Sequence, residues 1–179
     1  MQLMLRRRST LALPLSLLPA IGVQAALPMV TGSYDVAQMK AMKGLTFPRV
    51  LLYRSDGKLV DREDWPNEMT DLKQAAGDAF CCVSDKPSPP GWTGPPRDCK
   101  IVVYGENLDE HFTGLTSSSG IPLRRSDLPK HKYLVVEYFA AWCAPCLPAR
   151  KALEAYLGTS TARDTVALVV DFTKLAPGK

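Results

Sequence analysis

The sequence predicts an α/β fold in which helices pack on a mixed central sheet. Two apolar runs, Tyr133–Phe139 and Thr165–Asp171, have the length and the β-branched and aromatic content of buried strands. Between them, residues 148–157 have the composition and apolar spacing of a helix. A third buried strand is indicated at Arg49–Arg54, and strands that alternate with helices are typical of this fold class.

The first 25 residues have the layout of a secretory signal peptide. Three arginines at positions 6–8 precede an apolar stretch at 11–23. Val23-Gln24-Ala25 then supplies small residues at the positions that a signal peptidase recognises. We expect cleavage after Ala25, with Ala26 as the second choice. A membrane anchor is the competing interpretation, but the stretch is shorter than the ~20 residues that a spanning helix needs.

The signal peptide accounts for most of the net charge. The whole chain carries 22 basic and 18 acidic side chains, and removal of the segment leaves 19 and 18. A nearly neutral mature chain gives no support to nucleic-acid binding, which needs a clustered basic face. Export would place the protein in the bacterial periplasm, where disulfides persist, and all five cysteines lie in the mature part.

After the signal peptide, we expect a short helix, a hairpin and a second helix. Residues 34–43 have apolar side chains at helical spacing and are followed by a glycine. The strand Arg49–Arg54 leads into Ser55-Asp56-Gly57-Lys58, a strong turn, and a return strand at 59–62. Residues 66–80 again have the apolar spacing of a helix.

A proline-rich segment at 87–96 is predicted to form a long surface loop between two strands that contain Cys82 and Cys99. Because the ends of such strands can approach each other, we expect a structural disulfide between Cys82 and Cys99. A bond from Cys81 to Cys99, and a strained bond between the adjacent Cys81 and Cys82, are the alternatives. If Cys82 is bonded to Cys99, Cys81 would be buried or would pair with another molecule.

The motif Trp142-Cys143-Ala144-Pro145-Cys146 lies between the strand that ends at Phe139 and the helical segment. Strand, Cys-x-x-Cys and helix in this order form the context in which the motif indicates redox chemistry. Cys143 is expected just ahead of the helix, whose unpaired N–H groups stabilise a thiolate. The thiolate attacks a partner disulfide, and Cys146 is near enough to resolve the mixed disulfide.

A metal site is the competing interpretation of the cysteine pair. Zinc usually needs a second Cys/His pair at suitable spacing, which Cys81, Cys82 and Cys99 do not provide. Cu(I) held by the motif together with His111 or His131 is a further alternative. Both histidines lie in polar segments and are expected to face solvent. We therefore predict no metal ion and no organic cofactor.

Over about residues 120–172, the chain resembles the thioredoxin superfamily, and most closely the bacterial periplasmic thioredoxin-like proteins. The resemblance rests on Trp-Cys-x-Pro-Cys after a buried strand and on an acid six residues before the first cysteine, here Glu137. It implies that Glu137 is a buried proton carrier for Cys146. It also implies that Trp142 shields the site and contacts the partner, and that Pro145 sets the redox poise.

The family fold continues beyond the strand Thr165–Asp171 with a helix, a cis-proline loop, a hairpin and a last helix, whereas this sequence ends soon after that strand. The resemblance therefore implies an incomplete fold, a half-fold completed by a partner, or a circularly permuted fold. Residues 46–60 resemble the cis-proline and hairpin segment of the family. On the permuted interpretation, 66–80 is the last helix, and Pro48 faces Cys143 and contacts the substrate.

The sequence thus predicts a signal peptide at 1–25, an N-terminal region at 26–116 and a thioredoxin-like active-site half at 117–179. The expected function is that of an exported thiol–disulfide oxidoreductase that exchanges disulfides with protein partners through Cys143 and Cys146. A membrane electron donor is a candidate partner, and the direction of electron flow stays open. A thioredoxin-like binding or assembly module without turnover, and Cu(I) handling, are the alternative functions.

Overall fold

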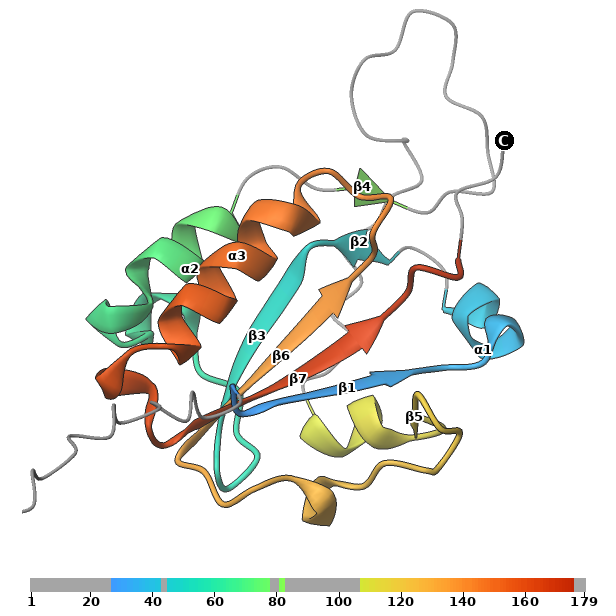
Figure 1. Ribbon diagram of the computed structural model, residues 1–179, viewed down its shortest axis with the longest axis horizontal. Helices are drawn as coiled ribbons and strands as arrows, with labels where there is room; N and C mark the ends of the chain where they lie inside the picture. The colour runs from blue at the N-terminus through green and yellow to red at the C-terminus, as the bar shows by residue number, and fades with distance from the viewer. Residues whose placement is uncertain (1–26, 43–44, 78–80, 83–106, 176–179) are drawn as a thin grey trace, which may run out of the picture.

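The computed structural model describes residues 27–42, 45–77, 107–175 and, for the backbone, 81–82. These residues form a five-stranded mixed sheet with the order β3-β6-β7-β1-β5 and a two-stranded ribbon of β2 and β4 (Figure 1). The predicted α/β class, with helices packed on a mixed sheet, is confirmed. The strands are β1 Met29–Ser33, β2 Thr46–Phe47, β3 Arg49–Arg54, β4 Cys81–Cys82, β5 Thr116–Ser117, β6 Tyr133–Phe139 and β7 Thr165–Asp171. The helices are α1 Val36–Ala41, α2 Thr70–Ala75 and α3 Cys146–Leu157, with 3-10 turns η1 Arg62–Asp64, η2 Asn67–Met69, η3 Leu108–Phe112, η4 Arg125–Asp127 and η5 Ser160–Ala162.

The strands predicted from apolar runs form the centre of the sheet. β6 and β7 are parallel, with Glu137 opposite Val169, and α3 connects them. β3 pairs antiparallel with β6 and places Val50 opposite Glu137. The bounds expected for these three strands are confirmed. β1, which was not predicted, adds in parallel to the other edge of β7.

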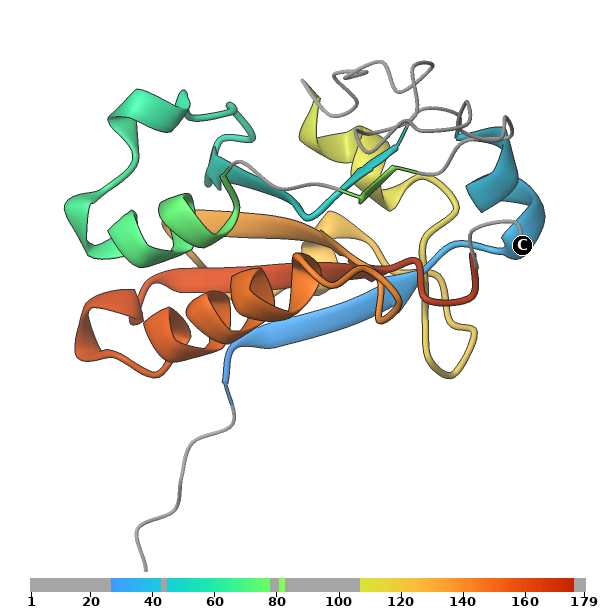
Figure 2. The same cartoon turned by 90° about the horizontal axis from the view of Figure 1, so that it is seen from above.

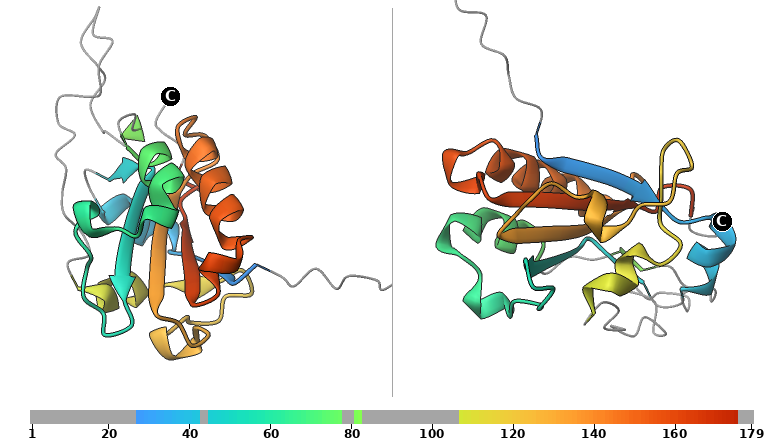
Figure 3. Two further views of the ribbon diagram at one scale, coloured as in Figure 1. Left: turned by 90° about the vertical axis from the view of Figure 1, so that its left-hand side faces the viewer. Right: turned by 90° about the horizontal axis from the view of Figure 1, so that it is seen from below.

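The central strands separate two buried clusters. Val135 of β6 packs in one cluster with Leu72 of α2 and Leu153 of α3. Its neighbours Leu134 and Val136 belong to the opposite cluster, as expected because successive side chains of a strand point to opposite faces. Figures 2 and 3 show α2 and α3 side by side along the sheet. The sheet therefore has a helical layer on one face and, on the other, the cluster that contains the Cys-x-x-Cys motif.

Three predicted elements are shorter than expected. The helix expected at 34–43 is α1, which covers only Val36–Ala41. The helix expected at 66–80 is α-helical only over α2, because Pro66 is extended (ψ 142°) and the chain then makes the 3-10 turn η2. Positions 78–80 lie outside the described residues. The return strand expected at 59–62 is reduced to one bridge between Tyr53 and Leu59, since η1 begins at Arg62.

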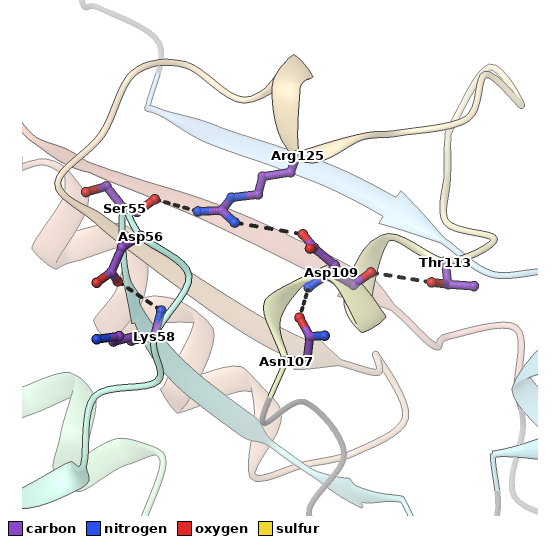
Figure 4. A network of polar contacts seen from close by, with 7 residues as sticks. All are labelled: Ser55, Asp56, Lys58, Asn107, Asp109, Thr113 and Arg125. Atoms are coloured by element: carbon purple, nitrogen blue, oxygen red, sulfur yellow. Dashed lines mark hydrogen bonds and ion pairs between the residues drawn. The ribbon is translucent and has the colours of Figure 1, made fainter.

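The predicted turn after β3 is confirmed and is held by Arg125. Gly57 has a φ of +89° in this turn, a backbone conformation that favours glycine. The Arg125 guanidinium donates a hydrogen bond to the carbonyl of Ser55 and lies 3.8 Å from the carboxylate of Asp109 (Figure 4). These contacts connect η3 and η4 to the end of β3. Because Asp109 is exposed, the ion pair contributes little to stability.

Several sequence predictions fall on positions that lack a structural description. Residues 1–26 and 83–106 lie outside the described residues, so the signal peptide, the proline-rich loop at 87–96 and the Cys82–Cys99 disulfide stay predictions. The strand expected around Cys82 is β4, and its partner is β2. Across the described ranges, no helix combines the length and hydrophobicity needed to cross a membrane.

Candidate functional site

The two motif cysteines lie at the junction between β6 and α3. β6 ends at Phe139, a short turn follows, and α3 begins at Cys146, so Cys143 lies just ahead of the helix as expected. The backbone N–H of Cys146 donates to the carbonyl of Cys143 at 2.9 Å, which closes the turn between them. Both side chains are fully buried.

The backbone of β2 contacts the sulfur of Cys143. The Sγ atom lies 3.4 Å from the carbonyl oxygen of Phe47, although the two residues are 96 positions apart in the chain. The Phe47–Pro48 peptide bond is cis. Because Phe47 contacts Cys143, the adjoining Pro48 lies near that cysteine, as the permuted interpretation expected, while its part in substrate binding stays a prediction.

Aromatic rings cover this contact. The ring of Phe47 meets Trp142 edge to face at a centroid distance of 5.5 Å and Phe172 at 5.1 Å. Trp142 and Pro145 are half-buried. Among the described residues, the indole Nε1 of Trp142 has no hydrogen-bond partner. This nitrogen is itself buried, so the shielding and partner contact expected of Trp142 stay predictions.

The two cysteines of the motif are in different oxidation states. Cys143 is in a disulfide, whereas Cys146 is a free thiol. A Cys143–Cys146 bond is therefore absent here, and the sulfur joined to Cys143 lies outside the described side chains. The motif therefore contains one bonded cysteine and one free thiol that could attack the bond.

Glu137 is fully buried on β6 and forms an ion pair with Arg150 of α3. The Nε atom of Arg150 donates to Oε2 of Glu137 at 2.7 Å, and the guanidinium also lies 4.4 Å from the ring centroid of Phe139. Burial raises the pKa of the Glu137 carboxyl to about 7, although the charge of Arg150 opposes the rise. Oε1 of Glu137 has no partner among the described residues. The carboxyl can therefore take up or release a proton near neutral pH.

Sequence reasoning missed Arg150. The spacing could have indicated it, because residues four apart lie on the same face of a helix and Arg150 follows Cys146 by four positions. Burial raises the pKa of the Cys146 thiol to about 11. A hydrogen bond with the backbone of Ala140 opposes this rise, the charge of Glu137 adds to it, and the charge of Arg150 opposes it. Cys146, Glu137 and Arg150 thus form one electrostatic group.

His111 is buried, which contradicts the expectation that it faces solvent. His111 lies in the 3-10 turn η3, and its ring is buried between two tyrosines. Nδ1 lies 2.8 Å from the hydroxyl of Tyr138, and Nε2 lies 2.7 Å from that of Tyr53. Burial lowers the pKa of His111 to about 4. Since both ring nitrogens are engaged, His111 could bind a metal ion only by losing one of these hydrogen bonds.

The other proposed copper ligand, His131, is half-buried in the segment before β6, where its Nδ1 is 2.7 Å from the carbonyl of Pro129. Within the described part of the chain, no three His, Cys, Asp or Glu side chains are grouped so as to hold a metal ion. The geometry thus offers a pair of cysteines and a buried carboxyl whose pKa is raised to about 7. The chain has no significant match to any protein-family model, curated protein or solved structure.

Proposed function

We propose that this protein is an exported thiol–disulfide oxidoreductase that exchanges disulfides with protein partners in the periplasm. The observation that carries the proposal is the state of the motif. Cys143 is bonded to another sulfur, and Cys146 is kept as a buried thiol beside Glu137 and Arg150. Chemistry that proceeds through a mixed disulfide requires one cysteine in each of these conditions.

The strand arrangement supports a circularly permuted thioredoxin-like fold. In the family, the active-site strand, the motif and the following helix lead into a parallel strand, and a proline loop with its antiparallel strand faces the cysteines. Here β6, α3 and β7 correspond to the first set, and Phe47, Pro48 and β3 correspond to the second, although they come first in the chain. On this proposal, α2 supplies the last helix and packs beside α3.

The exchange follows from the positions of the two sulfurs. In the reducing direction, the Cys143 thiolate attacks one sulfur of a partner disulfide, forms a Cys143–partner bond and releases the other sulfur as a thiolate. The Cys146 thiolate then attacks Cys143, forms the Cys143–Cys146 disulfide and releases the second partner thiolate. Two electrons pass from the protein to the partner. The same steps in reverse oxidise a partner dithiol.

Glu137 supplies the proton acceptor for the second step. A thiol whose pKa is about 11 is almost entirely protonated at neutral pH, so Cys146 must lose a proton before it attacks. The Glu137 carboxyl, with a pKa of about 7, accepts that proton, and Arg150 stabilises the carboxylate before it does so. The proton is then available for the departing thiolate.

The test is turnover of a disulfide-bonded reporter peptide by the protein in the presence of a dithiol reductant. We expect multiple turnovers for the wild type and none for Cys143→Ser. Cys146→Ser, reduced beforehand and then incubated with the peptide without the dithiol, should form a trapped adduct that added reductant removes. A binding module without turnover would retain the peptide but would not release reduced product. Exchange by the wild type at the same rate as by Cys143→Ser would show that the proposal is wrong.

A further inference from the structure

The disulfide at Cys143 needs a partner that the motif does not supply. Cys146 is a free thiol, and the chain contains five cysteines. A bond within one chain therefore leaves three candidates, which are Cys81, Cys82 and Cys99. The backbone of the first two is described, because they form β4.

The sheet register brings β4 next to the residue that contacts the sulfur of Cys143. β4 pairs antiparallel with β2, and Cys81 is directly opposite Phe47, the residue whose carbonyl lies 3.4 Å from Cys143 Sγ. Directly opposed residues of an antiparallel pair have Cα atoms about 4.5–5.5 Å apart. The register therefore places the backbone of Cys81 next to the residue whose carbonyl contacts the sulfur of Cys143.

We propose that Cys81 is the internal disulfide partner of Cys143, and that β4 occupies the edge of β2 where an extended segment of a protein partner would otherwise pair. This inference rests on the proposed function. A strand added to an exposed edge is held by main-chain hydrogen bonds, and here such a strand carries a cysteine. Figure 1 shows β2 and β4 at the end of the sheet where β6 leads into α3.

The alternation of a strand favours Cys81 over its neighbour. Cys81 shares a face of the β2–β4 ribbon with Phe47, since directly opposed residues lie on one face. Cys82, the next residue, lies on the other face. This division is compatible with the predicted Cys82–Cys99 disulfide. That disulfide leaves Cys81 unpaired, so Cys81 is available to bond Cys143.

The internal bond opens without any external oxidant or reductant. The Cys146 thiol loses its proton to Glu137, and its thiolate attacks the Cys143 sulfur. The Cys143–Cys81 bond breaks as the Cys143–Cys146 bond forms, and the Cys81 thiolate takes up a proton. The number of disulfides stays constant. The protein thus alternates between a state blocked by β4 and a state with the motif disulfide, and only the second frees the edge of β2 for a partner.

Peptide mapping of the full-length protein, purified without reductant and quenched in acid, tests this bond. Trypsin would release residues 74–97, which contain Cys81 and Cys82, residues 98–100 with Cys99, and residues 133–150 with the motif. We expect 74–97 joined to 133–150, with Cys146 unbonded. Cys81→Ser should abolish this link, whereas the matched Cys82→Ser should keep it. Cys146→Ser should preserve the link in nearly all molecules.

Three results would overturn the inference: a link that survives Cys81→Ser, a link from 98–100 to 133–150, or a wild type that contains only the Cys143–Cys146 bond. Turnover of the reporter peptide by Cys81→Ser separates this inference from the proposed function. If Cys81→Ser turns over the peptide but no Cys81 link is found in the wild type, only the internal partner is wrong. If Cys81→Ser has an intact motif and exchanges nothing, the proposed function fails.

Discussion

Arg150 donates from Nε to Oε2 of Glu137 at 2.7 Å, and the carboxyl that receives this bond is fully buried. The contact joins the middle of β6 to the second turn of α3, four residues after Cys146. Burial outweighs the attraction of Arg150, so the pKa of Glu137 rises to about 7. The pair thus places a proton acceptor of near-neutral pKa in the same electrostatic group as the free thiol.

Glu137→Gln should slow the step in which Cys146 resolves the mixed disulfide. In the wild type, this rate should rise as Glu137 loses its proton, with a midpoint near pH 7. Glutamine cannot accept the proton, so we expect the midpoint to disappear and the rate to fall by about 100-fold, a usual contribution of a positioned base. Rapid-quench measurement of the release of a peptide from its mixed disulfide, between pH 5 and 9, would show this.

The exposed carboxylate of Glu63 on η1 provides the matched control. Glu63→Gln should leave the rate and its pH profile unchanged. A Glu137→Gln profile that keeps the midpoint near pH 7 would assign that midpoint to another group.

Arg150→Met should move the same midpoint to higher pH. The charge of Arg150 lowers the pKa of Glu137, so its removal leaves the carboxyl buried without a cation and raises the pKa further. Arg150→Lys keeps a positive charge and should give a smaller shift. The exposed neighbour Lys151 is the control, and Lys151→Met should leave the midpoint in place. An unchanged midpoint in Arg150→Met would show that the ion pair only supports the fold.

The centre of the fold could be predicted because its strands are continuous apolar runs. β3, β6 and β7 have the bounds that the sequence indicated. β1 was missed because Met29–Ser33 is short and contains Gly32, which strand propensity disfavours. Its glycine is explained only by tertiary packing, since a Cβ there would lie 2.7 Å from Leu123 and 2.9 Å from Leu115.

The site could be predicted only in part. Glu137 and the motif are close in sequence, and the resemblance identified both. The pairing of β2 with β4, the disulfide of Cys143 and the ion pair of Arg150 depend on contacts between segments far apart in the chain or on opposite layers. Local sequence patterns do not determine which residues of such segments lie opposite each other.

His111→Gln should reduce the loss of stability in acid. The folded protein holds the pKa of His111 at about 4, below its ordinary value of 6.5, because the ring is buried. The unfolded chain therefore binds more protons between these values, and stability falls as the pH drops from about 6.5 toward 4. Glutamine does not titrate, so the variant should lose less stability over this window. Urea unfolding at pH 4.5 and 7.5 measures the difference.

His131, which is only half-buried, is the matched residue for this test. His131→Gln should show the wild-type loss of stability between the two pH values. An equal loss in His111→Gln and the wild type would mean that other groups cause the acid sensitivity.

Cys146 should resist alkylation in the native protein, and Glu137→Gln should make it more reactive. Burial is the main cause of the raised pKa of Cys146, and the negative charge of Glu137 adds to it. Above pH 8, where Glu137 is largely ionised, its neutral replacement should lower the pKa of Cys146 and speed the reaction with iodoacetamide several-fold. The same substitution should slow resolution, so the two rates are expected to change in opposite directions. Mass spectrometry of samples quenched over time at pH 8.5, with Glu63→Gln alongside, gives the alkylation rate. A decrease in both rates would indicate that the substitution disturbs the packing of the site, and would remove the case for Glu137 as the proton acceptor.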